Sequence, residues 1–405
     1  MSRPVADIVI VSWNGRDDTL RALDATLAQI GGGPRQVPGV RVTVVDNGST
    51  DGTREEVARR GDRVRFVGLS ENRGFTGGIA AGTEASDAES FVFLNNDALP
   101  EDGWLEALVE GLARADDDVV ALAGRIVDYE GELVDFVDGA MTFDGLAFQP
   151  GFRKPLGEVP EKPAGSEMLF ACGGNMIVRR EAYRQLGGFD DDFFAYLEDV
   201  DFGWRAWLAG RRVTWEPRAT VRHRSSATSN RLGDFERGVL FERNALQTAF
   251  KNYDDEHLQK MAGPIFLTLL HRMHRYTVDR NPGTELLRRP AFGEASHAGG
   301  AAASLVDRLL AKLGYHKGPV IVDPLTTTQF RATHWFFSNQ KRLAEKRAAV
   351  QAMRRRSDTD ILAKFAPLVV PTYHGDADLF GSALFAAFAK GLGLRRSTLK
   401  ELMER

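Results

Sequence analysis

The 405-residue sequence has one cysteine, Cys172, so it cannot form an internal disulfide. It also lacks an apolar run near the roughly 20 residues that span a bilayer, and the closest stretch is PIFLTLL at residues 264–270. The N-terminus has no basic segment, long apolar core and cleavage site of the kind that marks a secretory signal. These absences predict a cytoplasmic protein that does not cross a membrane.

Neither sign of charge is in large excess, because 52 Lys and Arg residues stand against 56 Asp and Glu residues. A chain without a global basic field is not expected to bind nucleic acid, so any polyanion site must be local. With 43% hydrophobic and 27% charged residues, the chain is typical of an ordinary globular protein. Its length is sufficient for two or three domains with sizeable cores.

The first half of the chain alternates short β-branched runs with helical patterns. Strands are predicted at residues 7–12, 40–45, 64–69 and 91–94, with helices at 19–30, 54–60 and 74–85 between them. This alternation predicts an α/β fold with a doubly wound, mostly parallel sheet and right-handed crossovers. Ligands of such sheets bind beyond the carboxyl ends of the strands. The polar clusters SWNG, DNGSTDG, ENRGFTGG and NNDALP are expected there.

After residue 122 the pattern loosens into short antiparallel strands and turns, and a glycine-interrupted strand is predicted at 170–179. A helix at 199–209 follows, because Val200, Trp204, Trp207 and Leu208 form one apolar stripe. Strands at 213–217 and 219–222 end this part, and helices dominate beyond about residue 232.

Six motifs occur in a fixed order: VSWN, VVDNGSTDGT, ENRGFTGG, FLNNDALP, GGFDDDFFAYLEDVDFGWRAWLAG and VRHRSSATS. Together they resemble the family 2 glycosyltransferases with the GT-A fold, most closely the bacterial rhamnosyl- and galactofuranosyltransferase branch, over residues 5–255. The resemblance implies a nucleotide-sugar donor, a divalent metal (Mn or Mg) and inversion at the anomeric carbon. It implies transfer to a hydroxyl of a glycan or polyprenyl-diphosphate-linked acceptor, in cell-envelope polysaccharide synthesis.

On this basis we predict three parts of the chain. Residues 1–232 are expected to form the GT-A catalytic domain, with a nucleotide-sugar half at 1–121 and an acceptor half at 122–232. Residues 233–405 are expected to form a mainly helical C-terminal region, which the resemblance covers only at its start.

Donor binding is assigned by the resemblance to six residues at the strand ends and the start of the third helix: Asp46, Asn72, Arg73, Gly74, Asn95 and Asn96. A helix start with free N–H groups and an arginine suits a phosphate or ribose. The competing interpretations are a turn or cap acid at Asp46 and a glycine-rich turn at residues 72–74.

Metal binding is assigned to Asp97 and His223. A hard cation stabilises the charge that a diphosphate leaving group gains as the sugar bond breaks. Asn95 stands where the family usually has the first acid of an acid-x-acid triplet, and it is expected to contact ribose or a metal-bound water. Imidazole beside carboxylate selects for Mn or Mg less strongly than oxygen ligands alone, so the metal's identity stays open. The alternatives are an N-cap before the helix at 101–112 for Asp97 and an internally hydrogen-bonded core histidine for His223.

Catalysis is assigned to Asp199 as general base and to Glu198 as a contact to the acceptor hydroxyl, with Asp201 as the substitute base. The alternative is that these acids only stabilise a helix N-terminus.

The segment 331–356 contains eight Lys or Arg residues beside Trp335, Phe336 and Phe337. Such a segment predicts peripheral contact with anionic lipid at the inner face of the membrane, unless it is a solvated helix face packed on its own protein.

Two other functions compete with transfer. An inactive sugar-nucleotide-binding or scaffold protein would keep the fold, and the amide at Asn95 supports it. A nicotinamide-dependent oxidoreductase is disfavoured, because the first strand continues into SWNGR and not into a G-x-G-x-x-G turn.

Overall fold

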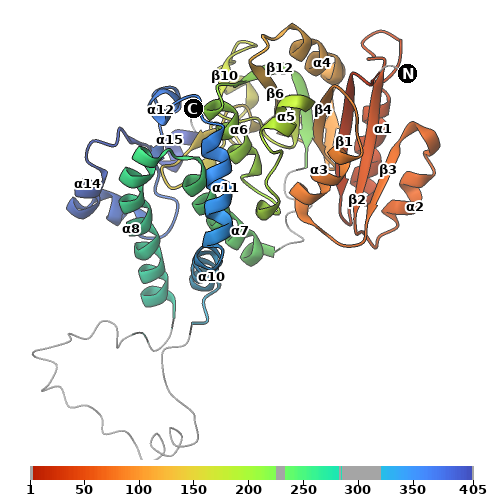
Figure 1. Cartoon of the computed structure of the whole chain (residues 1–405). Helices are drawn as coiled ribbons and strands as arrows, with labels where there is room; N and C mark the ends of the chain where they lie inside the picture. Colours follow the sequence, from red (N-terminus) through yellow and green to blue (C-terminus); the bar gives the residue numbers. More distant parts are fainter. Residues whose placement is uncertain (1–2, 225–232, 282–283, 285–320, 404–405) are drawn as a thin grey trace, which may run out of the picture.

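The structure, a computed structural model, describes residues 3–224, 233–281, 284 and 321–403 (Figure 1). Its main sheet contains β1 (Ala6–Ser12), β2 (Val40–Asn47), β3 (Arg65–Leu69), β4 (Ser90–Asn95), β5 (Ala98–Pro100), β6 (Val119–Asp128), β7 (Val134–Phe136), β10 (Glu167–Met168), β11 (Asn175–Arg179) and β12 (Arg212–His223). The strand order is β10-β12-β6-β11-β4-β1-β2-β3, with β5 paired to β12 and β7 to β6. Four pairings are parallel: β1 with β2, β1 with β4, β2 with β3 and β6 with β12.

Helices cover both faces of the sheet. Ser12 of β1 hydrogen-bonds to Thr19 of α1 (Arg16–Leu27), with 2.7 Å between the hydroxyl oxygens. The preceding residue, Val11, faces Gly78 of α3 (Gly74–Glu84). Successive side chains of a strand point to opposite faces, so α1 and α3 lie on opposite sides. The predicted doubly wound, mostly parallel α/β sheet is confirmed.

Glycines allow α3 to lie directly on the sheet. A Cβ atom added at Gly78 would overlap Val11, and one added at Gly82 would overlap Val9. The glycine-rich start of this helix is therefore a packing requirement as well as part of a motif.

Four further helices connect the remaining strands: α2 (Thr53–Ala58), α4 (Trp104–Arg114), α5 (Arg180–Gln185) and α6 (Glu198–Leu208). The strand β6 begins before residue 122, so a division at 121/122 would cut a continuous strand. The predicted strand at 170–179 is shorter than expected. Only Asn175–Arg179 is extended as β11, which runs antiparallel between β4 and β6. The backbone of Gly174 must pass close to Asn95, since a Cβ there would lie 2.7 Å from the Asn95 Nδ2.

The C-terminal region is helical, as predicted. It contains α7 (Gly233–Asn252), α8 (Asp255–Arg280), α10 (Pro324–Ser338), α11 (Gln340–Ala352), α12 (Asp358–Lys364), α13 (Asp376–Gly381), α14 (Ala383–Ala389) and α15 (Leu399–Met403). Figure 1 shows α7, α8, α10 and α11 side by side, next to α6 and away from β1–β3. Two short pairs, β8 (Ala140–Met141) with β9 (Ala147–Phe148) and β13 (Leu368–Val369) with β14 (Arg395–Arg396), complete the strands of the described residues.

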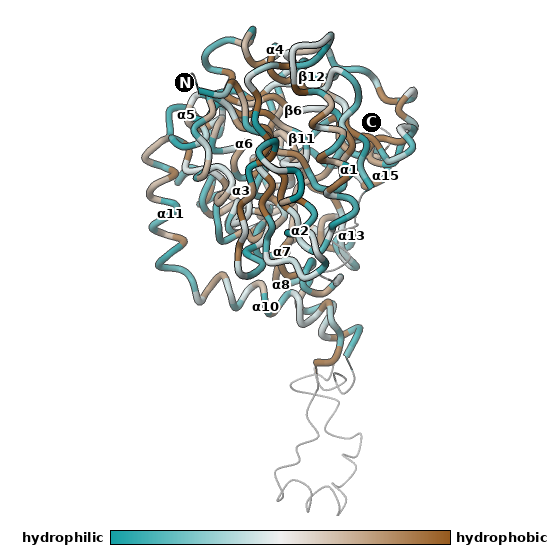
Figure 2. Tube along the Cα trace, turned by 90° about the vertical axis from the view of Figure 1, so that its right-hand side faces the viewer, coloured by the Kyte–Doolittle hydropathy of each residue, from teal (hydrophilic) through white to brown (hydrophobic). Residues whose placement is uncertain are grey.

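One apolar cluster runs through the sheet and the C-terminal helices. Buried Leu246 of α7, Leu269 of α8 and Leu343 of α11 belong to the same cluster as the strands of the sheet. Figure 2 shows the apolar segments gathered around β6 and β11, with more polar segments outside. The predicted boundary at residue 232 falls within 225–232, as does most of the RSSATS motif, so both lie outside the described residues.

The basic residues of 331–356 are largely engaged within the protein. Five of the eight form ion pairs: Arg331 with Glu236, Arg342 with Asp192, Lys346 with Asp190 and Asp192, Arg347 with Asp255, and Arg354 with Asp358. Arg356 donates to the carbonyl oxygens of Gly210 and Arg211. These contacts favour the interpretation of helices packed on their own protein. Within the described ranges, no helix has both the length and the apolar character needed to cross a bilayer.

Candidate active site

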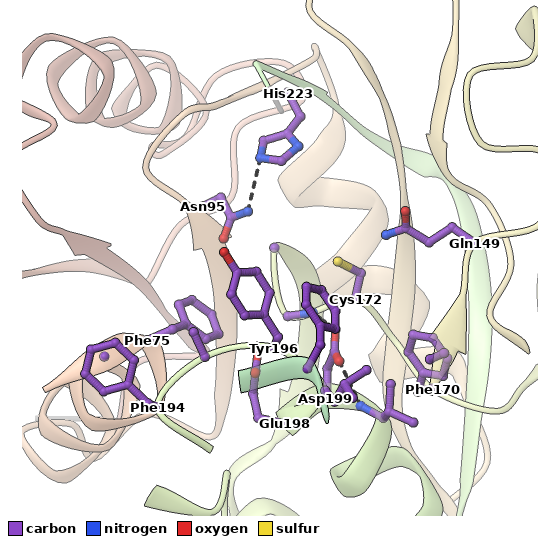
Figure 3. Close-up of a pocket in the computed structure, with 18 of the residues that line it drawn as sticks. Phe75, Asn95, Gln149, Phe170, Cys172, Phe194, Tyr196, Glu198, Asp199 and His223 are labelled. Atoms are coloured by element: carbon purple, nitrogen blue, oxygen red, sulfur yellow. Dashed lines mark hydrogen bonds between the residues drawn. The ribbon is translucent and has the colours of Figure 1, made fainter. Parts of the chain in front are cut away.

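A cavity of about 470 Å³ opens beyond the carboxyl ends of β1, β2 and β4 (Figure 3). Eight of the ten residues predicted for the site line it: Asn72, Gly74, Asn95, Asn96, Asp97, Glu198, Asp199 and His223. The remaining two, Asp46 and Arg73, do not. Residues from four separated segments therefore meet beyond the ends of the strands, where ligands of α/β sheets bind.

His223 and Asp97 face each other at one end of the cavity. His223 Nε2 lies 3.1 Å from Asp97 Oδ1 and 3.2 Å from Asn95 Nδ2, and its Nδ1 lies 2.8 Å from Asp135 Oδ2. Burial opposes protonation of His223, but the hydrogen bonds with Asp135 and Asp97 outweigh it and raise its pKa to about 10. Without a metal, the imidazole is therefore a cation between two carboxylates.

The donor set fits a divalent ion. Adjacent ligands of an octahedral ion with bonds of about 2.1 Å are about 3 Å apart, and Asp97 Oδ1 and His223 Nε2 have this separation. The Asp97 carboxylate does not cap α4, whose N-cap is Gly103. One carboxylate and one imidazole leave most positions to water and diphosphate oxygens, which suits Mn²⁺ or Mg²⁺ at a nucleotide site.

Asp135 was not predicted from the sequence. It lies on β7, in a stretch that reads only as short antiparallel strands, and it reaches His223 because β6 pairs with both β7 and β12. A carboxylate on the second nitrogen of a histidine fixes its tautomer and orientation toward a metal. Asp135 therefore completes this end of the site.

A second group of potential metal ligands lies in the C-terminal region. Asp254, His257 and Asp358 place one ligand atom each within 4.8 Å of one another. Their carboxylates are already used as caps: Asp254 accepts from the backbone N–H groups of His257 and Asp358, and Asp358 accepts from that of Asp254. This group is a helix-capping arrangement.

Glu198 and Asp199 form another wall of the cavity, at the N-terminus of α6. Asp199 accepts hydrogen bonds from the backbone N–H groups of Gly173 and Val200, at 3.0 and 2.8 Å. Glu198 Oε2 is buried and has no hydrogen-bond partner among the described residues. Burial raises the pKa of both carboxyl groups, and that of Glu198 is raised further by the charge of Asp199.

Asp201 does not contribute to the cavity. It is buried against Arg205 at 2.8 Å and Lys251 at 3.0 Å, and it accepts from Asn252 Nδ2. This ion-pair network joins α6 to α7, so Asp201 has a structural role and is not available as a base.

The residues near the start of α3 are held in place by hydrogen bonds to one another and to Asn47. Asn72 Oδ1 accepts from Asn47 Nδ2 and from the Gly74 N–H, both at 2.9 Å. Asn47 Oδ1 accepts from the Arg73 N–H, while the Arg73 side chain is exposed. Gly74 has φ +73°, and a Cβ there would overlap Phe194 O. The predicted turn interpretation thus explains the local geometry, although Asn72 and Gly74 also line the cavity.

Asp46 is fully buried at the end of β2. Its Oδ1 accepts from the Ser49 N–H at 3.1 Å, as a turn acid would, and Arg54 Nε lies 3.6 Å from its Oδ2. That second oxygen has no hydrogen bond within the described residues. The turn role accounts for one oxygen only, so donor binding by Asp46 stays a prediction.

The loop before α6 is strained. Phe194 has φ 63° and ψ −59°, and the Ala195 N–H donates to Phe193 O at 2.7 Å, which defines a γ-turn of the rare positive-φ kind. Tyr196 and Leu197 also have positive φ, 70° and 65°. Such conformations cost about 1–3 kcal/mol each and concentrate at functional sites. This loop delivers Tyr196, Glu198 and Asp199 to the cavity (Figure 3).

The wall formed by later segments of the chain is apolar. Phe148 and Phe152 line it from the β8–β9 region, and Leu399, Leu402 and Met403 of α15 line it from the C-terminal end. No periodic pattern in the sequence could place α15 there, since the contact joins segments some 250 residues apart. The Gly151 N–H donates to Leu402 O at 2.9 Å and holds the two segments together.

The family described as Glycosyl transferase family 2 matches residues 7–187, and Glycosyl transferase family group 2 matches residues 162–292. The chain is 30% identical to the N-acetylglucosaminyl-diphospho-decaprenol L-rhamnosyltransferase of Mycobacterium tuberculosis, over 47% of this chain and 69% of that protein. It is 31% identical to the Pre-mycofactocin glycosyltransferase of the same organism, over 46% and 37%, respectively. It is 29% identical to the O-antigen biosynthesis protein RfbC of Myxococcus xanthus, over 54% and 17%. The chain, with its GT-A-type sheet and helical C-terminal region, therefore belongs to glycosyl transferase family 2, in its rhamnosyltransferase-like branch.

Proposed function

We propose that the protein is an inverting glycosyltransferase that moves a sugar from a nucleotide-sugar donor to a hydroxyl of a glycan or lipid-linked saccharide. One observation carries the proposal. One cavity contains two residues suited to bind a metal ion, Asp97 and His223. The same cavity contains two buried carboxyl groups whose pKa is raised, those of Glu198 and Asp199. Inverting transfer needs these two functions on different sides of the sugar carbon.

The donor diphosphate is assigned to the end of the cavity near β4. Asp97 and His223 would hold a Mn²⁺ or Mg²⁺ ion, which when bound stabilises the negative charge of the leaving group. Asp135 orients His223. Asn95 and Asn96 line the cavity beside this pair and are assigned to the donor, with Asn72, Gly74, Asp46 and Arg73 as the remaining predicted donor contacts.

The general base is assigned to Asp199. Two backbone N–H groups fix its carboxylate, so it is oriented before an acceptor binds. A carboxylate whose pKa is raised by burial is a better proton acceptor than one in water. Glu198 is assigned to an acceptor hydroxyl, because its buried Oε2 lacks a partner that such a hydroxyl would supply.

The acceptor class rests on the relatives and on the apolar wall. The most informative relative is named for transfer to a decaprenol-linked diphosphate saccharide, and here Phe148, Phe152 and the α15 residues make one wall of the cavity apolar. We infer a role in cell-envelope polysaccharide synthesis at the cytoplasmic side. Lipid contact through 331–356 stays a separate prediction, because most cations of that segment are engaged within the protein.

An inactive sugar-nucleotide-binding protein is the second candidate. It is favoured by one observation: Asn95 presents an amide beside His223 where an acid would bind the metal more strongly. Metal-dependent hydrolysis of a bound nucleotide sugar would separate an enzyme from such a binding protein.

The first experiment is a thermal-shift screen of UDP-, GDP- and dTDP-sugars with and without MnCl₂. A ligand that binds only the native state raises the melting temperature, and we expect one nucleotide class to do so more strongly with Mn²⁺. Hydrolysis of that donor is then measured. If no nucleotide sugar raises the melting temperature under either condition, the proposal is wrong.

A further inference from the structure

Asn244 of α7 holds the strained loop that precedes α6. Its Nδ2 donates to three backbone carbonyl oxygens of this loop, those of Phe193 at 3.0 Å, Ala195 at 2.8 Å and Tyr196 at 2.8 Å. The side chain is fully buried and does not line the cavity. Two amide hydrogens thus serve three carbonyl groups, which the γ-turn at Phe194 turns toward α7.

The amide of Asn244 is itself fixed in one orientation. Its Oδ1 accepts from Gln247 Nε2 at 2.9 Å and from Arg243 Nε at 3.2 Å, so the nitrogen must face the loop. Arg243 adds hydrogen bonds from Nη2 to Asp192 O and Phe193 O, at 2.6 and 3.0 Å. Hydrogen bonds from α7 therefore hold the loop as far back as Asp192.

The same loop is held from its other side by the start of α3. The Thr76 N–H donates to Phe194 O at 3.1 Å, and Gly74 leaves room for the Phe194 backbone. The Tyr196 ring stacks on Phe241 of α7, with centroids 4.6 Å apart and planes inclined by 22°. A loop with three positive-φ residues keeps this shape only if surrounding contacts fix it.

We infer that Asn244 is a positioning residue for Glu198 and Asp199, acting through the loop from Phe193 to Leu197. The helical C-terminal region would then be part of the catalytic machinery, because α7 sets where the two carboxylates stand. The inference rests on the proposed function for its effect on turnover. Its effect on the geometry of the cavity can be measured independently.

The lone cysteine gives that independent readout. Cys172 lines the cavity next to Gly173, whose N–H binds Asp199, and its thiol interacts with the Asp199 carboxylate. Burial and the neighbouring carboxylates raise the pKa of this thiol, so little of the reactive thiolate forms near neutral pH. Displacement of Asp199 should therefore speed its reaction with the disulfide reagent DTNB, and no other thiol contributes.

The test compares Asn244→Asp with Asn281→Asp. Asn281 is a matched control, since it is also buried and its Nδ2 donates to Tyr276 O, Thr277 O and the Thr326 hydroxyl. It does not line the cavity. Both changes replace a donating amide nitrogen with an oxygen facing carbonyl groups, so both should lower the melting temperature.

We expect DTNB to label Cys172 at least about tenfold faster in folded Asn244→Asp than in the parent, with no change in Asn281→Asp. With the donor found by the screen, transfer should slow at least about tenfold in Asn244→Asp at unchanged donor KM. If Asn244→Asp does not fold, Asn244→Ser, which keeps one donor, replaces it.

Unchanged labelling in the folded variant, or equal acceleration in both variants, would overturn the inference. Accelerated labelling with unchanged turnover would also overturn it. If the parent transfers no sugar at all, the proposed function fails, and the labelling comparison still decides whether Asn244 sets the position of the loop.

Discussion

His223 Nε2 lies 3.1 Å from Asp97 Oδ1, although 126 positions separate the two residues in the sequence. β12 brings the histidine beside β5, directly after the aspartate, through the pairing of His223 with Ala98. Asp135 holds the other nitrogen of the same ring.

The first prediction concerns Asp135. Asp135→Asn should weaken Mn²⁺ binding by about 10–100-fold, because partners on the second nitrogen of a histidine contribute this much to metal affinity. Isothermal titration with MnCl₂ measures the affinity directly. His257→Gln, which alters the capping group on α8, is the control and should bind Mn²⁺ as the parent does. Equal affinity in Asp135→Asn and the parent would remove Asp135 from the site.

The second prediction concerns pH: the stability of the metal-free protein should fall as the pH rises, whereas the affinity for Mn²⁺ should increase. The pKa of His223 is raised from 6.5 to about 10 in the folded protein. Its protonation therefore stabilises the metal-free protein fully below about pH 6.5, and this stabilisation is lost as the pH rises toward 10. A metal needs the neutral ring, so the apparent Mn²⁺ affinity should rise with pH, by up to about tenfold per unit.

Thermal melting at pH 6.5, 7.5 and 8.5, with and without MnCl₂, checks both trends. His223→Gln should abolish the rise in Mn²⁺ affinity. A metal affinity in the parent that does not depend on pH in this range would show that the metal does not displace a proton from His223.

The third prediction separates backbone strain from steric overlap at Gly74. Gly74→Ala and Gly61→Ala both place alanine at positive φ, +73° and +60°, which costs about 1–2 kcal/mol in each. Only at Gly74 does the new Cβ meet another atom, Phe194 O, since nothing lies within 4 Å at Gly61. Gly74→Ala should therefore melt at a clearly lower temperature than Gly61→Ala. Equal melting temperatures would mean that α3 does not confine the loop.

The fourth prediction concerns Arg354, Arg355 and Arg356. Arg354 donates to Asp358 Oδ1 at 3.2 Å, and Arg356 donates to Arg211 O at 2.9 Å and lies over the Trp207 ring. Changing all three to Gln should therefore lower the free energy of unfolding by about 2 kcal/mol or more, measured by urea denaturation.

Lys341→Gln, at an exposed position of α11, is the control and should leave stability unchanged. A triple variant that is as stable as the parent but no longer binds anionic vesicles would restore the lipid-contact interpretation of this segment.

Much of the fold follows from local patterns. The alternation of residues 7–94 predicts β1–β4 and α1–α3 to within a few residues, because each element there is a β-branched run or a helical pattern between turn formers. The strand β6 was missed because VVALAGRIVD mixes small and polar residues and has no clear period. The antiparallel direction of β11 could not be predicted, since hydrophobic pattern carries no information on strand direction.

Only part of the candidate site could likewise be predicted from local sequence patterns. Asn95, Asn96 and Asp97 lie at the end of a buried strand. Because ligands of α/β sheets bind beyond the carboxyl ends of the strands, the sequence predicts these residues in the site. Asp135, Asn244 and the α15 residues act through contacts between distant segments, which leave no local signal. In α6, the motif alone does not predict which acid faces the cavity. Asp201 sits among the acids of the EDVD motif, yet it pairs with Lys251, a contact that depends on how α7 packs.

In the proposed mechanism, Asp199 removes the proton from the acceptor hydroxyl. Asp199→Asn keeps the size of the side chain and removes the proton acceptor, so the transfer rate should fall by roughly 100-fold or more. Donor affinity should stay the same. Stability should fall by about 1–3 kcal/mol, because the Asn amide has one acceptor oxygen, whereas Asp199 accepts from the N–H groups of both Gly173 and Val200. Glu198→Gln is the comparison, and it should mainly raise the acceptor KM.

The most direct measurement is the transfer rate of Asp199→Asn, taken with donor affinity and melting temperature on one preparation. A fall of roughly 100-fold at unchanged donor affinity is the predicted result. Full-rate transfer by a folded Asp199→Asn variant would show that Asp199 is not the general base and would assign that role to Glu198.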